Sequence, residues 1–524
     1  MATIVTTPEA PARGPAPAPA PRQDRVPSRL RQYAWLAPLL PALATVLLLA
    51  APVSTGDVST SGKVTPADAA SAVMILTVAV RLLRHRARPL TATAALLLGA
   101  PTVGFALSAM TSADPGAGLA GFLRYVQVFV LVPASLVLLL RDRRDFAVVA
   151  GAVVAVALVQ GAIGVWQYAT GTGASYMGED IRAVGTFGPS DIMGMATVVA
   201  YGLVVATGCA LVPAAAGAPR WLRPAALACA AALVVPLVVS FSRGTWIATA
   251  VACAAMIVLS GRRQALRVFG VLAASSVLLV GGLGVGSQMI SERVASITQV
   301  KAAPDPSVTD RYTLWAAALG MWREHPATGV GLKRFPDERD GHASLALSSG
   351  SDTAGAGQRF TREPLLSPHN MYLLALSEQG LIGFTLLVGG WAAYLARGTD
   401  RLLRVRRSPG PRAPGAAACG LAAVGLLIWS CVDFLYADIG GPSTVLTAVL
   451  IGLAAWWALS PAATAPDSGT GTGTDASGRV GSALCTATAT GVGSTPGPRT
   501  GPGPRTGPGT GTSAGTDAGP GGPR

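Results

Sequence analysis

The sequence predicts an all-α polytopic membrane protein with about twelve transmembrane helices and one large extracytoplasmic loop. Three observations predict this class: the composition, a series of long apolar segments, and a one-sided distribution of basic residues. The 524 residues are 51% hydrophobic and only 13% charged, and the mean hydropathy is +0.48. A soluble domain carries about 25% charged residues, so this composition indicates that lipid is the main solvent.

The apolar segments are long enough, some of them only just, to cross about 30 Å of hydrocarbon at 1.5 Å per residue. They lie at about residues 33–51, 67–83, 90–110, 119–140, 145–168, 190–212, 224–241, 244–260, 266–287, 370–396, 414–435 and 441–459. The first segment could be a secretory signal. Its length of about nineteen residues and the apolar segments that follow it favour a retained helix.

The chain is therefore expected to have five parts. They are a disordered cytoplasmic N-terminus (1–32), membrane helices one to nine (33–287), the extracytoplasmic loop (288–369), membrane helices ten to twelve (370–459) and a disordered tail (460–524). The two ends are rich in Pro, Ala, Gly and Thr, a composition that cannot bury a core.

Basic residues give the orientation of the helices. The loops that follow even-numbered segments carry clusters of arginine, at 81–88, 141–144, 220–223, 262–267 and 397–412. The short loops after odd-numbered segments carry only Lys63, Arg182 and Arg243. Because cytoplasmic loops collect Lys and Arg, both termini are predicted to be cytoplasmic and the loop at 288–369 to face outward. The expected location is the bacterial cytoplasmic membrane.

The outer loop is expected to contain an amphipathic helix within residues 308–324. Tyr312, Trp315, Leu319 and Trp322 recur there at helical spacing. We expect this helix to pack on the membrane domain or to lie at the membrane interface.

Several classes of site are not predicted. The net charge of +14 comes from short arginine clusters between apolar segments, without the interleaved aromatic and basic residues of a nucleic-acid-binding surface. The six cysteines form no CxxC pair, and the four histidines are scattered. We therefore expect no metal site, no cofactor and no disulfide framework.

Three arginines on the outer side are candidates for binding an anion, because guanidinium fits phosphate oxygens in a planar fork. Arg243 lies in SFSRGTW, at the junction of two apolar segments; the alternative is a helix-capping arginine that reaches the interface. Arg311 opens the predicted loop helix, where a cation opposes the helix dipole; the alternative is an ion pair with Asp310. Arg182, in RAVGTFGPSD, has the alternative of a solvated loop residue.

One histidine is a candidate general base. His369 begins the tenth segment in SPHNMYLLALSEQGLIG, immediately after the outer loop, where a neutral imidazole can accept a proton. The alternative is a structural histidine at a helix start. Asn370 beside it can donate and accept hydrogen bonds, while Glu378 is expected to hold helix packing.

These segments resemble the O-antigen ligase and Wzy-type polymerase superfamily. SFSRGTW, then DRYTLWAAALGMWREHPATGVGLKRF, then SPHNMYLLALSEQGLIG follow the order and spacing of the family over about residues 182–385. RAVGTFGPSD is similar to a further block, but the family's Asn-Pro-Asn-like turn is replaced by Gly188, Pro189, Ser190 and Asp191.

The resemblance implies a metal-independent glycosyltransferase with a GT-C-type membrane fold. Such enzymes move a glycan from an undecaprenyl-diphosphate carrier to an acceptor hydroxyl, on a saccharide or cell-wall polymer, at the outer face of the membrane. By position, the family's arginines match Arg243 and Arg311, and its loop histidine matches His369. Arg182 and Asn370 are then expected to bind substrate, with the departure at 188–191 weakening the case for Arg182.

Other functions remain open at the level of sequence. A polytopic transporter of a lipid-linked or small polar substrate fits the number of helices, but transporters usually show internal repeats and broken or ionisable helices at mid-membrane. A non-catalytic assembly scaffold is a further alternative. Ligase and polymerase share topology and motifs, so the sequence does not separate them.

Overall fold

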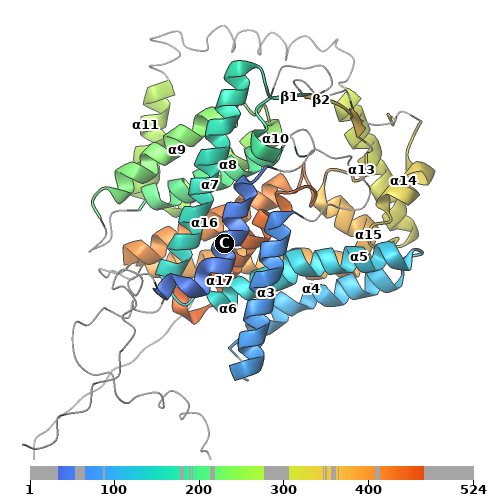
Figure 1. Ribbon diagram of the computed structural model, residues 1–524, viewed down its shortest axis with the longest axis horizontal. Helices are drawn as coiled ribbons and strands as arrows, with labels where there is room; N and C mark the ends of the chain where they lie inside the picture. Colours follow the sequence, from blue (N-terminus) through green and yellow to red (C-terminus); the bar gives the residue numbers. More distant parts are fainter. Residues whose placement is uncertain are drawn as a thin grey trace, which may run out of the picture. The chain divides into compact units, whose positions relative to one another are not determined.

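A computed structural model gives the architecture of the chain (Figure 1). It describes residues 34–52, 65–85, 89–176, 182–187, 191, 193–212, 219–276, 306–345, 347–348, 351–355, 361–363, 365–407 and 413–464. The predictions for residues 1–32, and for the tail beyond residue 464, lie outside this part of the chain.

Within the described residues, six helices are long and apolar enough to cross a membrane. They are α3 (Pro66–His85), α4 (Ala92–Met110), the continuous run of α5 (Pro115–Val126), η3 (Gln127–Leu131) and α6 (Val132–Leu139), α7 (Arg143–Thr170), α15 (Met371–Arg407) and α16 (Ala413–Asp433). Shorter apolar helices are the run of η1 (Ala34–Leu39), α2 (Leu40–Leu47) and η2 (Leu48–Ala50), then α8 (Gly194–Ala210), α9 (Leu222–Val238), α10 (Arg243–Leu259) and α17 (Thr444–Leu459).

The remaining elements belong mainly to the loops. They are η4 (Gly185–Phe187), α11 (Arg262–Ser276), α13 (Pro306–Glu324), α14 (Phe335–His342), η7 (Pro461–Ala463), and the strands β1 (Ala174–Tyr176), β2 (Ser351–Gly355) and β3 (Thr361–Glu363). The strands form one antiparallel sheet in the order β1-β2-β3. Ala174 pairs with Gly355, and Ser351 pairs with Glu363.

The predicted helical membrane architecture is confirmed in its coarse form. Every predicted segment except the ninth coincides with an apolar helix. The ninth, 266–287, overlaps α11, which ends at the edge of the described residues, so the count of twelve and the GT-C type stay predictions. The sequence analysis did not predict the small sheet, in which β1, after α7, pairs with β2 of the outer loop.

The core of the bundle is formed by α17 and α8. Every residue of α17 is buried, and so are most residues of α8. α17 packs against α6, α15 and α16, while α8 packs against α7, α9 and α16. A helix that is apolar on all sides is stable only when other helices surround it. By contrast, α3 and α9 leave several leucines and valines exposed, as helices that face lipid do.

The helix α15 is broken at Gly380, which the sequence analysis did not predict. Gly380 has φ 60° and ψ −167°, outside the helical region. The backbone groups freed by the break pair with a short loop after α13: the Leu381 amide donates to the Pro326 carbonyl (2.8 Å), and the Val330 amide donates to the Ser377 carbonyl (2.9 Å). The part after the break is roughly 40 Å long at 1.5 Å per residue, enough to cross the membrane alone.

The break provides a stability prediction. A β-carbon at Gly380 would lie 2.4 Å from the Ala327 carbonyl carbon and require a conformation reserved for glycine, whereas a β-carbon at Gly389 meets no atom within 4 Å. Gly380→Ala is therefore expected to destabilise the fold by at least about 1–3 kcal/mol, the cost of backbone strain alone. Thermal unfolding in detergent measures this. Gly389→Ala is the matched control on the same helix, and an equal loss of melting temperature in both variants would contradict the account.

Candidate functional site

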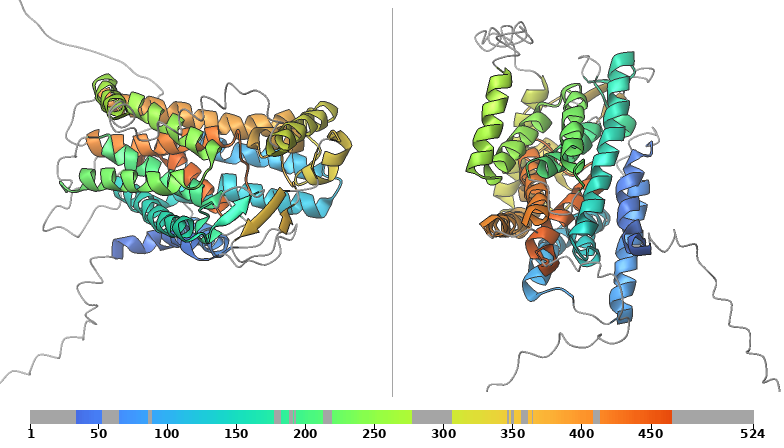
Figure 2. Two further views of the ribbon diagram at one scale, coloured as in Figure 1. Left: turned by 90° about the horizontal axis from the view of Figure 1, so that it is seen from above. Right: turned by 90° about the vertical axis from the view of Figure 1, so that its left-hand side faces the viewer.

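Several helix ends meet at one end of the bundle. α9 ends and α10 begins there, α16 ends and α17 begins there, and α15 starts there after the outer loop. We call the connecting segments at this end the rim, defined as residues 239–243, 365–370 and 434–443. Figure 2 shows α13, α14 and the strands gathered at one end of the bundle, and the contacts below place the rim beside them.

The first rim segment presents Arg243. Ser242 is the N-cap of α10, and its hydroxyl accepts a hydrogen bond from the Thr245 amide (3.4 Å). Phe241, at φ 51°, packs its ring 6.0 Å from that of Tyr168 at the end of α7. Arg243 is exposed, and its guanidinium makes no hydrogen bond or ion pair with the described residues. The cap is thus supplied by Ser242, which leaves the cation available to another partner.

The second and third rim segments are joined by backbone hydrogen bonds. The Met371 amide, which begins α15, donates to the carbonyls of Phe434 (2.9 Å) and Ala437 (3.0 Å). A β-carbon built on Gly244 would lie 3.3 Å from the side chain of Tyr436. The first turn of α10 therefore contacts the same turn of chain that holds the start of α15. These contacts bring the neighbours of Arg243 and of His369 together.

His369 stands at the entry to α15 in an unusual conformation. Its φ is +48° and its side chain is exposed. Left-handed backbone is uncommon for residues other than glycine, and such outliers gather at functional sites. The His369 amide donates to the Ser367 hydroxyl (3.4 Å). The imidazole makes no hydrogen bond or ion pair within the described part of the chain, so both ring nitrogens are open to substrate.

Asn370 is a positioning residue in this structure. It is 7% exposed, and its side-chain oxygen accepts from the Leu373 amide (3.0 Å), which caps α15. Its side-chain nitrogen donates to the Leu435 carbonyl (3.0 Å) in the third rim segment. These two hydrogen bonds join the start of α15 to the third rim segment and leave one N–H and one oxygen lone pair of the amide. The substrate contact of Asn370 stays a prediction.

A second histidine of the outer loop has a different environment. His342, the last residue of α14, donates through Nδ1 to the Glu338 carbonyl (2.9 Å), and its Nε2 lies 3.1 Å from a Glu324 carboxylate oxygen. The Glu338 carbonyl, and then the Glu324 carboxylate, raise the pKa of His342 above its ordinary value. This histidine holds α14 against α13 and is not a candidate base.

The helix predicted in the outer loop lies within α13, and its packing face is not the one that carries the aromatic residues. The buried residues are Leu314, Ala317, Ala318 and Met321, which pack towards α15 and α14. The aromatic series that begins at Tyr312 is instead half-buried or exposed. Small and aliphatic side chains allow α13 to approach α15 closely, so they take the inner face and the aromatic rings remain outside.

Arg311 lies on the flank of α13 that faces the rim. Trp315, one turn later on the same flank, donates its indole N–H to the Pro368 carbonyl (2.9 Å), and Pro368 precedes His369. Arg311 is half-buried and makes no hydrogen bond or ion pair with the described residues. The alternative of an ion pair with Asp310 is wrong, because the Asp310 carboxylate accepts two hydrogen bonds from Ser348, at 2.8 and 2.6 Å.

Arg182 lies beside the first rim segment. It forms an isolated bridge with Ala174, with the Arg182 amide donating to the Ala174 carbonyl (2.7 Å). The next amide, of Ala183, donates to the Val239 carbonyl (3.2 Å) in the first rim segment. Ala174 belongs to β1, which pairs with β2 of the outer loop. Figure 1 shows β1 and β2 between the end of α7 and α13.

These contacts form a series along the end of the bundle. The series runs from the segment of Arg182 to the turn before Arg243 and on to the Tyr436 turn. It then reaches the start of α15 with His369 and, through Trp315, the flank of α13 with Arg311. Strand β1, which pairs with Arg182, also pairs with β2 of the outer loop. The structure thus brings the segments of the four predicted residues together. Two guanidinium groups without a partner among the described residues, together with an exposed imidazole, can neutralise an anion and accept a proton.

Sequence reasoning missed the loop that supports this site. The stretch ATGVG, residues 327–331, inserts between the α15 break and the turn after α4. Gly329 has φ 70°, and a β-carbon there would lie 2.4 Å from the Glu378 backbone. Glu378 is buried, accepts from the Phe335 amide (3.3 Å) and so holds the start of α14, as its expected packing role requires. The alternating glycines were the signal that could have indicated this close approach.

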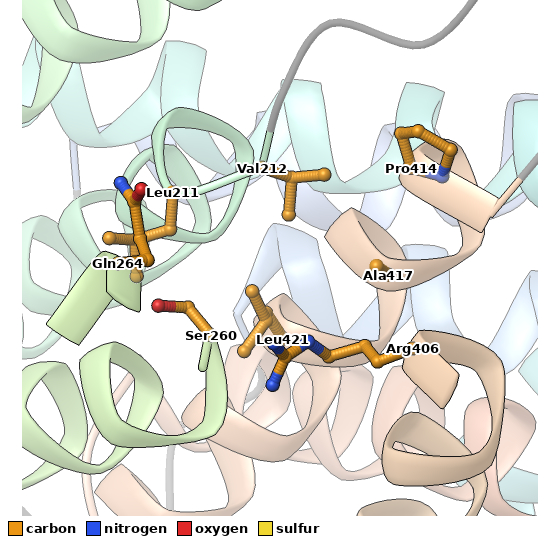
Figure 3. Close-up of a pocket in the computed structure, with 8 residues that line it drawn as sticks. All are labelled: Leu211, Val212, Ser260, Gln264, Arg406, Pro414, Ala417 and Leu421. Carbon is orange, nitrogen blue, oxygen red and sulfur yellow. The ribbon is translucent and has the colours of Figure 1, made fainter. Parts of the chain in front are cut away.

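A cavity of about 260 Å³ lies at the opposite ends of α8, α10 and α15 (Figure 3). Its lining residues are Leu211, Val212, Ser260, Gln264, Arg406, Pro414, Ala417 and Leu421. None of the predicted site residues lines it. Arg406 also donates to the Leu259 carbonyl, which satisfies the end of α10. The cavity is therefore separate from the rim.

The described residues contain no group of three or more His, Cys, Asp and Glu side chains arranged to hold a metal ion. The rim segments themselves carry the guanidinium of Arg243 and the carboxylate of Asp438.

Comparison with known protein families gives one match. Residues 225–388 match the family model described as O-antigen ligase. This range contains Arg243, Arg311 and His369, whereas Arg182 lies before it. No curated protein matched the chain. The matched range lies within the resemblance noted over residues 182–385 except for its last few residues. The stretch that carries Arg243, Arg311 and His369 thus matches the O-antigen ligase family.

Proposed function

We propose that the protein transfers a glycan from an undecaprenyl-diphosphate carrier to an acceptor hydroxyl at the outer face of the bacterial cytoplasmic membrane. The family match and the apolar helices already make it a multi-pass membrane protein of the O-antigen ligase type. The proposal adds the carrier, the side of the membrane, the cytoplasmic placement of both termini and the roles of individual residues. It is supported most by one observation: Arg243, Arg311 and His369 fall within the matched range, and the contacts of the rim connect their segments.

The arginines act on the leaving group. When the bond between the anomeric carbon and the diphosphate oxygen breaks, its electron pair stays with undecaprenyl diphosphate, and negative charge grows there. Arg243 and Arg311 stabilise that charge, because preorganised cations lower the barrier where charge develops in the transition state. Arg182 is a further contact for the glycan or its diphosphate, ranked below these two because it lies outside the matched range.

His369 acts on the acceptor. Its neutral imidazole removes the proton of the acceptor hydroxyl as the hydroxyl oxygen bonds to the anomeric carbon from the face opposite the diphosphate. The configuration at that carbon is therefore inverted. Asn370 holds the histidine in place through its two hydrogen bonds to the start of α15 and to Leu435. The acceptor is a saccharide or a cell-wall polymer, and its identity decides between ligase and polymerase.

The test of this function uses the purified full-length protein in lipid vesicles. The vesicles receive a lipid-linked oligosaccharide, with and without candidate acceptors, and the products are separated by size. A ladder of lipid-linked products is the result expected of a polymerase, and transfer of a single block to the acceptor is that expected of a ligase. Unchanged donor in every mixture, with protein that remains folded, would contradict the proposal.

We predict that transfer needs no metal ion, because the arginines supply the positive charge that a metal would otherwise provide. Treatment of the vesicles with EDTA, followed by removal of the chelate, is expected to leave the transfer rate within about twofold of its original value. Metal analysis of the treated sample provides the control. A loss of activity that a divalent cation restores would show that the arginines are insufficient.

Transport is the competing function, and the break in α15 is the observation closest to it, since transporters often use broken helices. Here, however, backbone groups on both sides of the break are paired with residues 326–331. The buried Asp68 on α3 is also engaged, because Arg124 on α5 donates to it. The proposed glycosyltransferase therefore accounts for more of the structure.

A further inference from the structure

The outward flank of α13 carries a pair of aromatic side chains. Tyr312 is 64% exposed, and its ring meets that of Trp315 edge to face, with centroids 5.6 Å apart and an angle of 80° between the planes. The opposite face of the helix is filled by Leu314 and its buried neighbours, so the two rings do not pack into the bundle. We call Tyr312 and Trp315 the aromatic pair.

The aromatic pair is held in a fixed place beside the candidate site. The Trp315 indole donates to the Pro368 carbonyl, so the polar atom of this side chain is satisfied and its ring is tied to the residue before His369. Tyr312 then extends the surface outward from that fixed ring. A rigid aromatic surface loses little conformational entropy when it binds a ligand.

Arg311 lies next to the aromatic pair by helical geometry. Residues three and four apart on a helix are neighbours, and Arg311 is four residues before Trp315, a rise of about 6 Å. It is adjacent in sequence to Tyr312. Its guanidinium makes no hydrogen bond or ion pair with the described residues. The guanidinium of Arg311, which no described residue pairs, and the two aromatic rings thus lie within about one turn of helix.

We propose that the aromatic pair binds the sugar ring that is joined directly to the diphosphate of the donor. The inference rests on the proposed function, in which Arg311 binds the diphosphate. Because this sugar is joined to the diphosphate through its anomeric oxygen, the distance between the two is no longer than one turn of helix. One face of a pyranose ring carries C–H groups, which pack against the electron-rich face of an aromatic ring.

Exposed Tyr and Trp side chains also occur at the membrane–water interface, so contact with lipid is the alternative role of the aromatic pair. The contacts of α13 favour the sugar over lipid. The aromatic pair lies between an unpaired arginine and the residue that precedes the exposed histidine, and lipid contact would not require either neighbour. The sugar subsite also explains why Trp315 is fixed by a hydrogen bond to Pro368, since the ring must be aligned with the reacting carbon.

The experiment measures carrier binding without turnover. The full-length protein in lipid nanodiscs receives either undecaprenyl diphosphate or the same carrier bearing one glucose, galactose or N-acetylglucosamine. For at least one sugar, binding is expected to be about three- to tenfold tighter than for the bare carrier, the range of a single ring contact. Tyr312→Ala is expected to remove this gain without changing affinity for the bare carrier. Tyr312→Phe, which keeps the ring, is expected to retain it.

The outcomes separate this inference from the function on which it rests. Equal affinity of bare and glycosylated carriers for the wild type, or a gain that survives in Tyr312→Ala, would overturn the sugar subsite while leaving diphosphate binding intact. An equal loss for all carriers in Tyr312→Ala would indicate a lipid-contact role and also overturn it. If the wild type binds no carrier, or if Arg311→Ala binds the bare carrier as tightly as the wild type, the proposed function itself fails and the inference falls with it.

Discussion

Replacement of His369 by alanine is expected to lower the rate of glycan transfer by about 10²- to 10⁴-fold, the range of general base catalysis. The acceptor hydroxyl then has no group to take its proton as it attacks. The fold should be unaffected, because the imidazole is exposed and has no hydrogen-bond partner among the described residues. Transfer is measured in vesicles, together with the amount of protein inserted and its melting temperature.

The control for this variant is another exposed histidine of the same loop. His325 lies just after α13 and its side chain is exposed. His325→Ala should retain the rate of the wild type. Binding of the bare carrier should also be unchanged in His369→Ala, since the histidine acts on the acceptor. Normal transfer by His369→Ala would end the assignment of this residue as the base.

Replacement of Arg311 by alanine is expected to lower the transfer rate by about 10²- to 10³-fold, the cost of removing one group that stabilises developing charge. Unlike the histidine variant, Arg311→Ala should also bind the bare carrier more weakly, because the guanidinium contacts the diphosphate before and during reaction. Arg311→Lys should recover only part of the loss, since an ammonium cannot make the paired contact of the guanidinium fork.

The same helix offers a matched control for Arg311. Arg323 lies near the end of α13 and is exposed; it is about 18 Å further along the helix axis than Arg311 and about 120° around it. Arg323→Ala removes the same charge from the same helix and is expected to change neither carrier binding nor transfer. If the two alanine variants behave alike, Arg311 acts only through the net charge of the loop, and its direct contact with diphosphate is refuted.

The membrane helices were predictable because their signal is local. An apolar run such as residues 145–168 is long enough to cross hydrocarbon, and α7 occupies Arg143–Thr170. The break in α15 was not predictable in this way. It depends on the pairing of Leu381 with Pro326, which lie far apart in the sequence, and nothing within the apolar run itself reports that contact.

The face of α13 shows where pattern reading fails. The spacing of Tyr312 and Trp315 correctly indicates a helix, but periodicity alone does not say which apolar stripe is buried. Leu314 and Ala318 take the inner position because their size allows close approach to α15. The sequence motifs did identify Arg243, Arg311 and His369 as candidates. Their common location could not be read from the sequence, because it depends on tertiary contacts such as Trp315 with Pro368.

The central claim is that Arg243 and Arg311 bind one diphosphate at a single site. The most direct test is a double-mutant cycle on the affinity for bare undecaprenyl diphosphate, measured for the wild type, Arg243→Ala, Arg311→Ala and the double variant in nanodiscs. Residues that share one ligand are coupled, typically by about 0.5–3 kcal/mol. We predict that the double variant loses less affinity than the product of the two single losses. Losses that multiply would show that the arginines act independently, and would contradict the shared site.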